Sequence, residues 1–303
     1  MQETFTDLYL AFFAAHLVVA PGYLLIGLVA AWIFWRMRRI GGNFWHWLVP
    51  MRIYLHHSHL IDLQLFLITR GLAALGILGA VTVTTLMATS IASLMPAPVL
   101  QPGALSPILL AFVLWLPSDF ANYWVHRLHH NWSVIWPFHA VHHSAEVLTP
   151  LTTYRQHPIG NLLAACAQSV IVGVIQGVLV GALSPEAQIA EIAGINACIV
   201  MANAALAALH HSHVWLSYGP VLEYLVISPA QHQIHHSKDP NHYNRNFGTS
   251  LAVWDWLFGT LYVIRGPESL EFGLDEEKEK SLMTQRLWFV LWDPVNRVLR
   301  RSG

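Results

Sequence analysis

The sequence HAVHHS at residues 139–144 is repeated as HQIHHS at residues 232–237. A related cluster, HRLHH, occupies residues 126–130, just before the first copy. In each cluster two histidines are four residues apart, and this spacing puts both on one face of a helix, one turn apart. Two imidazoles in that arrangement can bind the same metal ion. The three clusters therefore predict helical segments that present histidines to bound metal.

The clusters offer more nitrogen ligands than one metal ion needs. A tetrahedral site takes four protein ligands at most, so eight histidines at these spacings predict two metal ions with room for an exogenous ligand. All-nitrogen ligation fits zinc, iron, copper or nickel and disfavours calcium and magnesium. The eight residues are His126, His130, His139, His142, His143, His232, His235 and His236.

The composition indicates a membrane protein. The 303 residues are 55% hydrophobic and 11% charged, whereas soluble domains carry about 25% charged residues. The net charge of −1 argues against an electrostatic nucleic-acid binder. The two cysteines, Cys166 and Cys198, lie inside apolar runs. We expect them to be inert packing residues, and they indicate no disulfide framework.

Five largely apolar runs predict membrane helices, because about 20 apolar residues span the hydrocarbon core of a bilayer. We expect Pro21 to kink the first helix, Arg70 interrupts the second run, and the last two runs are typical of a helical hairpin. The fold class predicted is therefore all-α: a polytopic membrane protein of about four to five transmembrane helices with a cytoplasmic histidine-rich helical cap. The runs cover residues 8–35, 64–95, 105–125, 160–182 and 187–209.

We find no repeated domain and no low-complexity tail, so residues 1–303 are expected to form a single integral membrane domain. Within it we expect N-terminal membrane helices in residues 1–116 and, in residues 117–265, the region that carries the histidine clusters. Residues 266–303 are expected to form a C-terminal tail that is cytoplasmic or lies at the membrane interface.

The distribution of basic residues predicts the topology. The N-terminus and the loops at residues 96–104 and 183–186 contain no Lys or Arg, whereas nearly all basic residues lie in the other connections. The positive-inside rule makes those other connections cytoplasmic. Five crossings from an outside N-terminus then put all three histidine clusters on the cytoplasmic side. The short loops and the lack of an organelle-retrieval signal favour a bacterial inner membrane.

Acidic residues near the clusters are candidates for orienting the metal ligands. Asp119 precedes His126 by seven residues, two helical turns, so its carboxylate can accept the other ring N–H of that histidine. Capping or wetting a helix end is an equally good role for Asp119. Glu146 and Asp239 each follow a cluster by three residues and can act in the same way. The WDW sequence at residues 254–256 is typical of an interfacial aromatic anchor with one polar handle.

These segments resemble the fatty acid hydroxylase/sterol desaturase superfamily of integral membrane non-haem di-iron oxygenases. The matching sequences span about residues 117–260 and read SDFANYWVHRLHH, FHAVHHSAE, YRQHP, HHSHV and SPAQHQIHHSKDPNHYNRNFGTSLAVWDWLFGT. The resemblance implies that the eight cluster histidines hold two iron ions. It adds His157 of YRQHP as a ligand and, from HHSHV, His211 or less favourably His210. This chain has HHSH where relatives often have QHSN, and Asn244 stands where an aspartate is common.

The resemblance also implies a function, the oxidation of a lipid. Such an enzyme hydroxylates or desaturates a C–H bond of a fatty acyl chain or sterol, with O₂ as co-substrate and external electrons. The sequence has no G-x-G-x-x-G fingerprint opening a βαβ unit and no Fe–S cysteines. A separate electron donor, such as a reductase, a ferredoxin or a cytochrome b5-type protein, is therefore expected. Membrane lipids are the other expected partners.

Three alternatives leave out the redox chemistry. A membrane metal-binding or transport protein keeps the metal, but a transporter places ligands near the middle of the membrane, whereas these clusters lie at helix ends. A zinc hydrolase needs a catalytic acid within a cluster, as in H-E-x-x-H, and none of the three has one. A catalytically silent scaffold leaves the histidine pattern unexplained. Metal binding without redox chemistry is therefore the main alternative to lipid oxidation.

Overall fold

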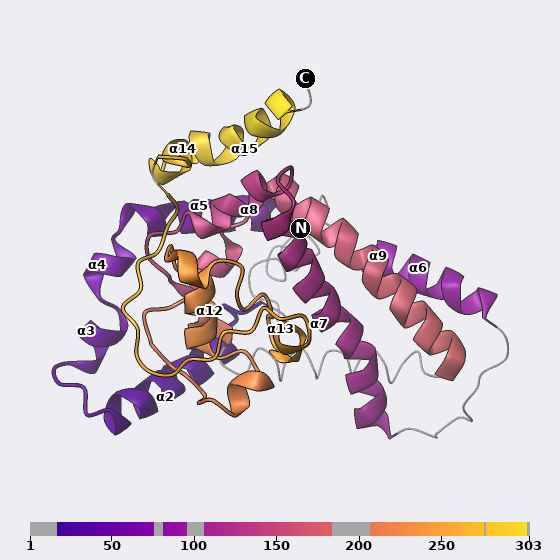
Figure 1. Cartoon of the computed structure of the whole chain (residues 1–303), viewed down its shortest axis with the longest axis horizontal. Coiled ribbons are helices and arrows are strands. Elements are labelled where there is room, and N and C mark those ends of the chain that lie inside the picture. The colour runs from indigo at the N-terminus through magenta and orange to yellow at the C-terminus, as the bar shows by residue number, and fades with distance from the viewer. Residues whose placement is uncertain (1–16, 76–80, 96–105, 184–206, 276, 302–303) are drawn as a thin grey trace, which may run out of the picture.

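The structure is a computed structural model that describes residues 17–75, 81–95, 106–183, 207–275 and 277–301. In these ranges the chain forms helices joined by loops (Figure 1). Extended pairing among the described residues is limited to two isolated bridges, Val226 with Leu251 and Ser237 with Phe272. The expected all-α class is therefore confirmed for the part of the chain that is described.

The described helices divide into a set of longer helices and a set of short helices within loops. The longer ones are α2 (Pro21–Met37), α5 (His57–Ala74), α6 (Val81–Leu94), α7 (Pro107–Asn131), α9 (Pro158–Leu183) and α15 (Leu287–Arg301). The short α-helices are α3 (Phe44–Leu48), α4 (Met51–Tyr54), α8 (Trp136–His143), α11 (Ala208–His210), α12 (Pro229–His235), α13 (Val253–Leu257) and α14 (Lys280–Met283). The 3₁₀ helices are η1 (Pro150–Tyr154), η4 (Leu222–Tyr224) and η5 (Pro240–His242).

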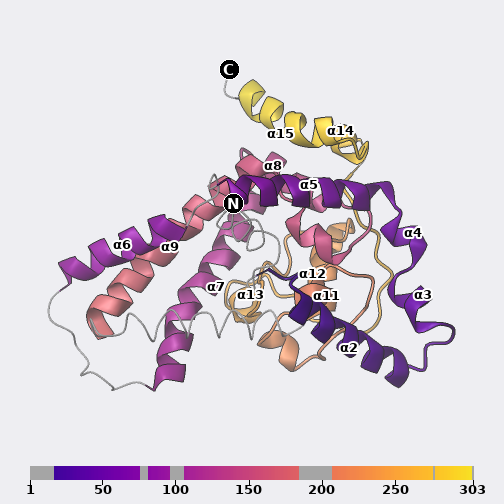
Figure 2. The ribbon, with the colours of Figure 1, turned by 180° about the vertical axis from the view of Figure 1, so that it is seen from behind.

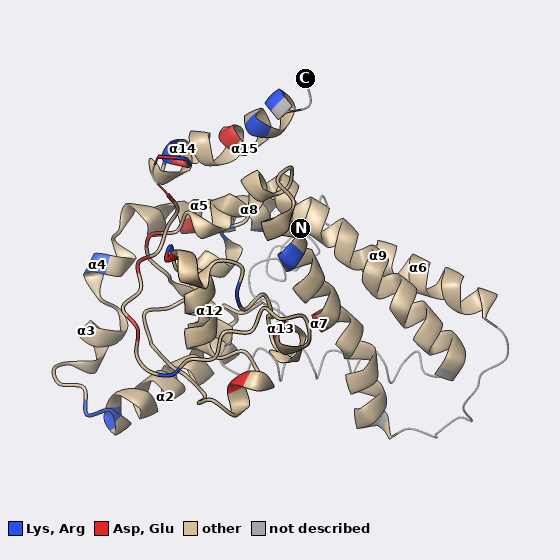
Figure 3. Ribbon diagram, in the orientation of Figure 1, with Lys and Arg blue, Asp and Glu red and all other residues tan. Residues whose placement is uncertain are grey.

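Two of the described helices are long and apolar enough to cross a bilayer. They cover Ile108–Asn131 of α7 and Pro158–Ala182 of α9, and they suggest that the protein associates with a membrane. Charged residues are absent from α6 and α9, and α7 carries only Asp119 and Arg127 (Figure 3). The helices α6, α7 and α9 extend to one side of the molecule, away from α3 and α4 (Figures 1 and 2).

The helix boundaries differ from those expected from hydropathy. Instead of kinking a longer helix, Pro21 begins α2, where its fixed φ and missing N–H are suited to the first turn. The apolar run at residues 64–95 contains two helices, α5 and α6, and α5 already begins at His57. Most of the fifth run, the expected hairpin partner of α9, lies outside the described residues. Hydropathy counts apolar residues and does not locate the ends of helices.

Glycines set the close packing of α6 against α9. Gly173, Gly177 and Gly181 follow one another at intervals of four residues and so form one face of α9. A Cβ atom at Gly177 would lie 2.7 Å from the carbonyl oxygen of Ala88 and 2.7 Å from the Cβ of Ile91. Only small residues allow two apolar helices to approach this closely, as is common in membranes. The charge-free face of α9 is therefore used for helix packing.

The helix that carries the second histidine cluster is fixed by apolar packing on both sides. Ala140 and Val141 of α8 belong to a buried cluster with Leu65 of α5 and with Leu282 and Val290 from α14 and α15. Figures 1 and 2 show α15 lying across α8 and α5. The C-terminal helix therefore forms part of the support of α8.

We expect the substitution Gly177→Leu to destabilise the protein by about 1–3 kcal/mol, because the added side chain overfills the α6–α9 contact. Gly22→Leu is the matched control, since a Cβ at that helical glycine meets nothing within 4 Å. The two variants are compared by their thermal unfolding midpoints in detergent, which are measured from the loss of monodisperse protein on heating. Equal midpoints for both variants would contradict the glycine packing described here.

Candidate metal centre

The histidine clusters converge on two adjacent groups of side chains. In each group the candidate ligand atoms all lie within 4.8 Å of one another, and both groups are formed by histidines alone among the described residues. The rings of His143 and His236, one from each group, are stacked with centroids 4.6 Å apart. Group A contains His126, His130, His139, His143 and His235, and group B contains His142, His211, His232 and His236.

The two copies of His-x-x-His-His divide their histidines between the groups in opposite ways. On α8, His139 and His143 are four residues apart and both enter group A, whereas His142 enters group B. At α12, His232 and His236 have the same spacing and both enter group B, whereas His235 enters group A. Each copy therefore gives its same-face pair to one group and its middle histidine to the other. This division explains why the motif occurs twice.

The nitrogens of group B lie at the spacing of ligands around one ion. The Nε2 atom of His211 is 3.0 Å from that of His236, 3.0 Å from that of His232 and 3.3 Å from that of His142. Nitrogens bound to one metal ion at about 2.1 Å lie about 3.0–3.4 Å apart. His211 therefore supplies the central contact of group B. Its Nδ1 atom lies 3.0 Å from the hydroxyl of Thr153, which orients the ring.

The Nε2 nitrogens of group A are buried and have no hydrogen-bond partner. This holds for the Nε2 atom of all five histidines of the group. Two of the rings have a fixed tautomer, because Nδ1 of His126 donates to the carbonyl of Phe247 (2.8 Å) and Nδ1 of His235 donates to that of Arg245 (2.7 Å). A carbonyl only accepts, so Nδ1 carries the proton and the Nε2 lone pair is free. Such outer hydrogen bonds are typical of metal-binding histidines.

A loop with two left-handed residues presents those carbonyls. Asn244 (φ 58°) and Asn246 (φ 53°) have positive φ, which asparagine tolerates better than most residues. The carboxylate of Asp255 accepts hydrogen bonds from the backbone N–H groups of Phe247 (2.8 Å) and Gly248 (2.7 Å). The sequence prediction of an interfacial anchor at residues 254–256 therefore differs from the structure at Asp255, which is fully buried and fixes the loop behind His126.

The start of α12 is specified by its sequence. Ser228 caps the helix, and its hydroxyl accepts a hydrogen bond from the backbone N–H of Gln231 (3.1 Å). The side chain of Gln231 accepts one in return from the N–H of Ser228 (3.0 Å). This reciprocal capping box, with Pro229 in the first turn, starts the helix in a defined register. The register decides which face carries His232.

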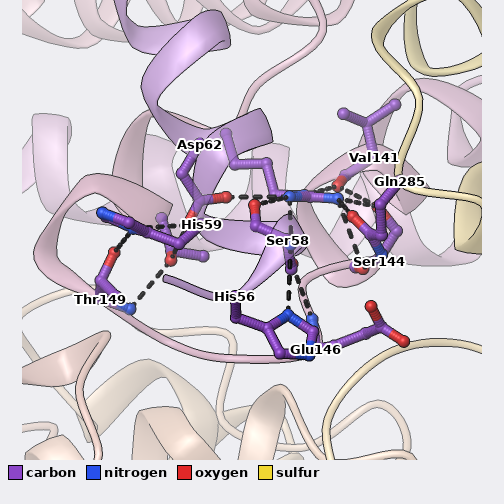
Figure 4. Close-up of polar contacts among 11 residues, drawn as sticks. His56, Ser58, His59, Asp62, Val141, Ser144, Glu146, Thr149 and Gln285 are labelled. Carbon is purple, nitrogen blue, oxygen red and sulfur yellow. Dashed lines mark hydrogen bonds and ion pairs between the residues drawn. The ribbon is translucent and has the colours of Figure 1, made fainter. Parts of the chain in front are cut away.

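The end of α8 is held by the buried guanidinium of Arg155, which is fully inaccessible to solvent. It donates to the carbonyl of Val141 (2.8 Å) and the hydroxyl of Ser144 (2.8 Å), on either side of His142 and His143. It also pairs with the carboxylate of Asp62 on α5 (2.9 Å). Figure 4 shows Asp62, Val141 and Ser144 gathered at these bonds. Arg155 therefore positions the second histidine cluster.

Burial keeps these histidines in the neutral form that binds metal. Removal from water lowers the pKa of His142 to about 3 and that of His235 to about 4. Both rings are therefore uncharged at neutral pH, with a lone pair available. A set of neutral imidazoles fits a first-row transition metal, and the unpartnered Nε2 atoms of group A and the nitrogen spacing of group B both agree with such an ion.

Two of the additional histidines predicted as ligands, His157 and His210, lie outside both groups. The Nδ1 atom of His157 accepts a hydrogen bond from the N–H of Ile159 (3.2 Å), and its Nε2 atom donates to the carbonyl of Leu291 (2.9 Å). Both of its nitrogens are therefore used, in a contact between α9 and α15. His210 is buried, and its ring stacks on that of His232 at 5.2 Å.

The acidic candidates do not contact the histidines in the way the sequence predicted. The carboxylate of Asp119 accepts from the indole N–H of Trp254 (2.8 Å), while the ring of His126 bonds to Phe247 instead. Asp239 caps η5. The backbone N–H of Glu146 donates to the hydroxyl of Ser58 (3.0 Å, Figure 4), and its side chain borders surface cavities.

A cavity of about 360 Å³ reaches both histidine groups. His126 and His139 of group A line it together with three residues of group B. A second cavity, of about 390 Å³, reaches group A from another side through His130, His143 and His235. The histidine centre therefore lies between two cavities.

The family comparison matches the fatty acid hydroxylase family over residues 110–260. This segment contains all nine histidines of groups A and B. The chain belongs to the fatty acid hydroxylase family. The match begins in the first turn of α7 and ends at Thr260, whose hydroxyl donates to Asp255. The loop behind His126 is thus part of the fatty acid hydroxylase segment.

Curated relatives of this fatty acid hydroxylase family member carry lipid-related names. The chain is 32% identical to the ornithine lipid hydroxylase OlsE of Rhizobium tropici over 168 residues. These residues cover 55% of this chain and 46% of that protein. It is 26% identical over 163 residues to an alkylglycerol monooxygenase of Xenopus tropicalis (54% and 32%). It is 23% identical over 159 residues to a very-long-chain aldehyde decarbonylase of Oryza sativa subsp. japonica (51% and 24%).

The matched segments span less than half the length of each of these relatives. The comparison with solved structures found no significant match.

The sequence analysis did not single out Arg155, Thr153 or the carbonyls of Arg245 and Phe247. Arg155 could have been found from the sequence, since it is part of the YRQHP segment. A backbone carbonyl could not, because every residue has one and no residue type marks it.

We expect Asp62→Ala to destabilise the protein by about 3–5 kcal/mol, because it leaves the buried guanidinium of Arg155 without its counter-charge. The control is Glu271→Ala, which removes an ion pair of similar length to Lys238 (2.8 Å) that lies at the surface and contributes little. Thermal unfolding in detergent distinguishes them. A loss for Asp62→Ala as small as that of the control would show that this pair does not hold α8.

Proposed function

We propose that this protein is a membrane-bound non-haem di-iron oxygenase that hydroxylates a C–H bond of a lipid. One observation supports this proposal above the others: two adjacent groups of histidines, seven of the nine buried, have nitrogens directed at one another and border one cavity. Desaturation of the lipid is a related outcome of the same chemistry. The names of the relatives, two hydroxylases or monooxygenases of lipids among them, support the lipid as substrate class.

We propose the nine histidines of groups A and B as the ligands of the two irons. Group A then offers five nitrogens and group B four. His157 and His210 are left out of this set, since His157 uses both ring nitrogens elsewhere and His210 lies outside both groups. The proposed ligands all fall within the catalytic region at residues 117–265.

Two bound irons would supply the reduction of O₂ and the oxidation of an unactivated C–H bond. In a hydroxylation one oxygen atom enters the lipid and the other leaves as water, with two electrons and two protons from outside. The carbonyls of Phe247 and Arg245 keep the protons of His126 and His235 on Nδ1. Seven of the nine histidines are buried, which limits the access of bulk water to the centre. The cavity walls orient the lipid against groups A and B.

The proposed setting is a membrane, with the histidines at its cytoplasmic face and the N-terminus outside. Support comes from the two membrane-length helices, of which α7 ends at the first histidine cluster and α9 begins shortly after Arg155. Basic residues near these ends, including Arg127, agree with a cytoplasmic location. We propose a bacterial inner membrane and a separate electron donor protein. Metal binding without redox chemistry would not need the cavity beside the two groups.

Metal analysis of the purified protein tests this function. After reconstitution with ferrous iron under reductant, we expect about two irons per chain, because the two groups each provide a complete set of imidazoles. His143→Ala in group A and His236→Ala in group B should each reduce the content to about one iron or less, and the double variant should hold almost none. His46→Ala, which changes a histidine outside both groups, is the control.

Activity is measured on the same preparations. Lipids from membranes that overproduce the protein are compared by mass spectrometry with and without oxygen, and with the double variant. We expect an oxygen-dependent gain of one oxygen atom in a lipid of the wild-type sample alone. A folded protein that takes up no transition metal would refute the di-iron proposal. Two irons without any oxidised lipid would favour metal binding without redox chemistry.

A further inference from the structure

Arg70 is a cation on an otherwise apolar part of α5. The residues around it, from Phe66 to Ala74, contain no other charge. Its Nε atom is buried and has no hydrogen-bond partner, and its guanidinium lies over the ring of Tyr154 at 5.4 Å. No ion pair joins Arg70 to an acidic side chain among the described residues. The side chain is half-buried, so a cation without a counter-charge is held there at an energetic cost.

Arg70 lines the cavity of about 360 Å³, and five of the nine histidines of groups A and B line the same cavity. No Asp or Glu belongs to the described lining of this cavity, so Arg70 is its one permanently charged side chain there. The remaining walls are mostly apolar but also carry hydrogen-bonding side chains. Amide side chains of Asn122, Asn161, Gln156 and Gln168 all line it.

We propose that this cavity binds the anionic end of a lipid and that Arg70 is the residue that anchors its carboxylate or phosphate. The proposal rests on the proposed function, because it names the substrate class of the same centre. A guanidinium offers a planar fork of N–H donors that matches both acidic groups. Arg70 is the residue of the described lining that carries such a fork.

The size of the cavity agrees with this assignment. About 360 Å³ is near the lower end of the range of about 300–1,000 Å³ for small-molecule sites. It takes a polar head and the carbons next to it, while the rest of a long acyl chain continues beyond the cavity. Val125, Phe138, Ala164 and Ala165 supply the apolar wall that such carbons need.

The experiment measures binding and does not depend on turnover. Purified full-length protein in a neutral detergent is titrated with radiolabelled palmitate and with 1-palmitoyl lysophosphatidate, which carry the two acidic groups on the same chain. Palmitamide and monopalmitoylglycerol are the neutral controls. We expect the wild type to bind at least one of the two anions about tenfold or more tightly than the neutral lipid with the same chain. Which anion binds more tightly identifies the source of the acidic group.

Arg70→Gln should remove this preference, so that the anion and its neutral control bind equally, and Arg70→Lys should retain part of it. Arg52→Gln, which changes an exposed arginine of α4 outside the cavity, should leave the preference as it is in the wild type. A wild type without preference for either anion would overturn the proposal without any need of a variant. So would an Arg70→Gln protein that unfolds at lower temperature but keeps the preference.

Iron content measured on each sample separates this inference from the proposed function. If Arg70→Gln holds as much iron as the wild type but loses the preference for anions, the anion site is supported on an intact centre. If the wild type prefers anions but takes up no iron, the di-iron oxygenase proposal fails while the anion site stands. If iron is bound and no anion is preferred, the anion site alone is wrong.

Discussion

The buried guanidinium of Arg155 is the contact on which the histidine centre depends. A cation with no access to water needs a partner for nearly every N–H, since leaving one unpaired costs several kcal/mol. Arg155 therefore draws together α5 through Asp62, the end of α8 through Val141 and Ser144, and the segment before α15 through Gln285. These elements are fixed relative to one another by a residue that belongs to neither histidine group. The orientation of three histidines follows from that arrangement.

Local periodicity predicted much of this centre and could not predict the rest. The four-residue spacing correctly indicated which histidines share a helix face, and His139 with His143 and His232 with His236 do enter the same group. The group that His142 or His235 enters depends on the side chains that face the other side of its helix. Those side chains come from distant parts of the sequence, so local spacing does not predict them. The same holds for His157: its nitrogens are used by Ile159 nearby and by Leu291, 134 residues away.

Hydropathy identified the helical class but placed several boundaries wrongly. It counts apolar side chains, whereas a helix begins where a cap or a proline makes the first turn favourable, as at Pro21 and Ser228. Spacing along one helix likewise suggested Asp119 as a partner of His126. The indole of Trp254, 135 residues away, uses that carboxylate instead. The family resemblance was correct because the histidine pattern, unlike these contacts, is written entirely in local sequence.

The division of each histidine repeat between two groups would couple the two proposed ions mechanically. The helix α8 and the region of α12 each carry histidines of both groups, so the spacing within one group cannot change without moving residues of the other. By linkage, any effect of one ion on the binding of the second would be mutual. The shared helices would thereby make the two proposed ions parts of one unit rather than occupants of two independent sites.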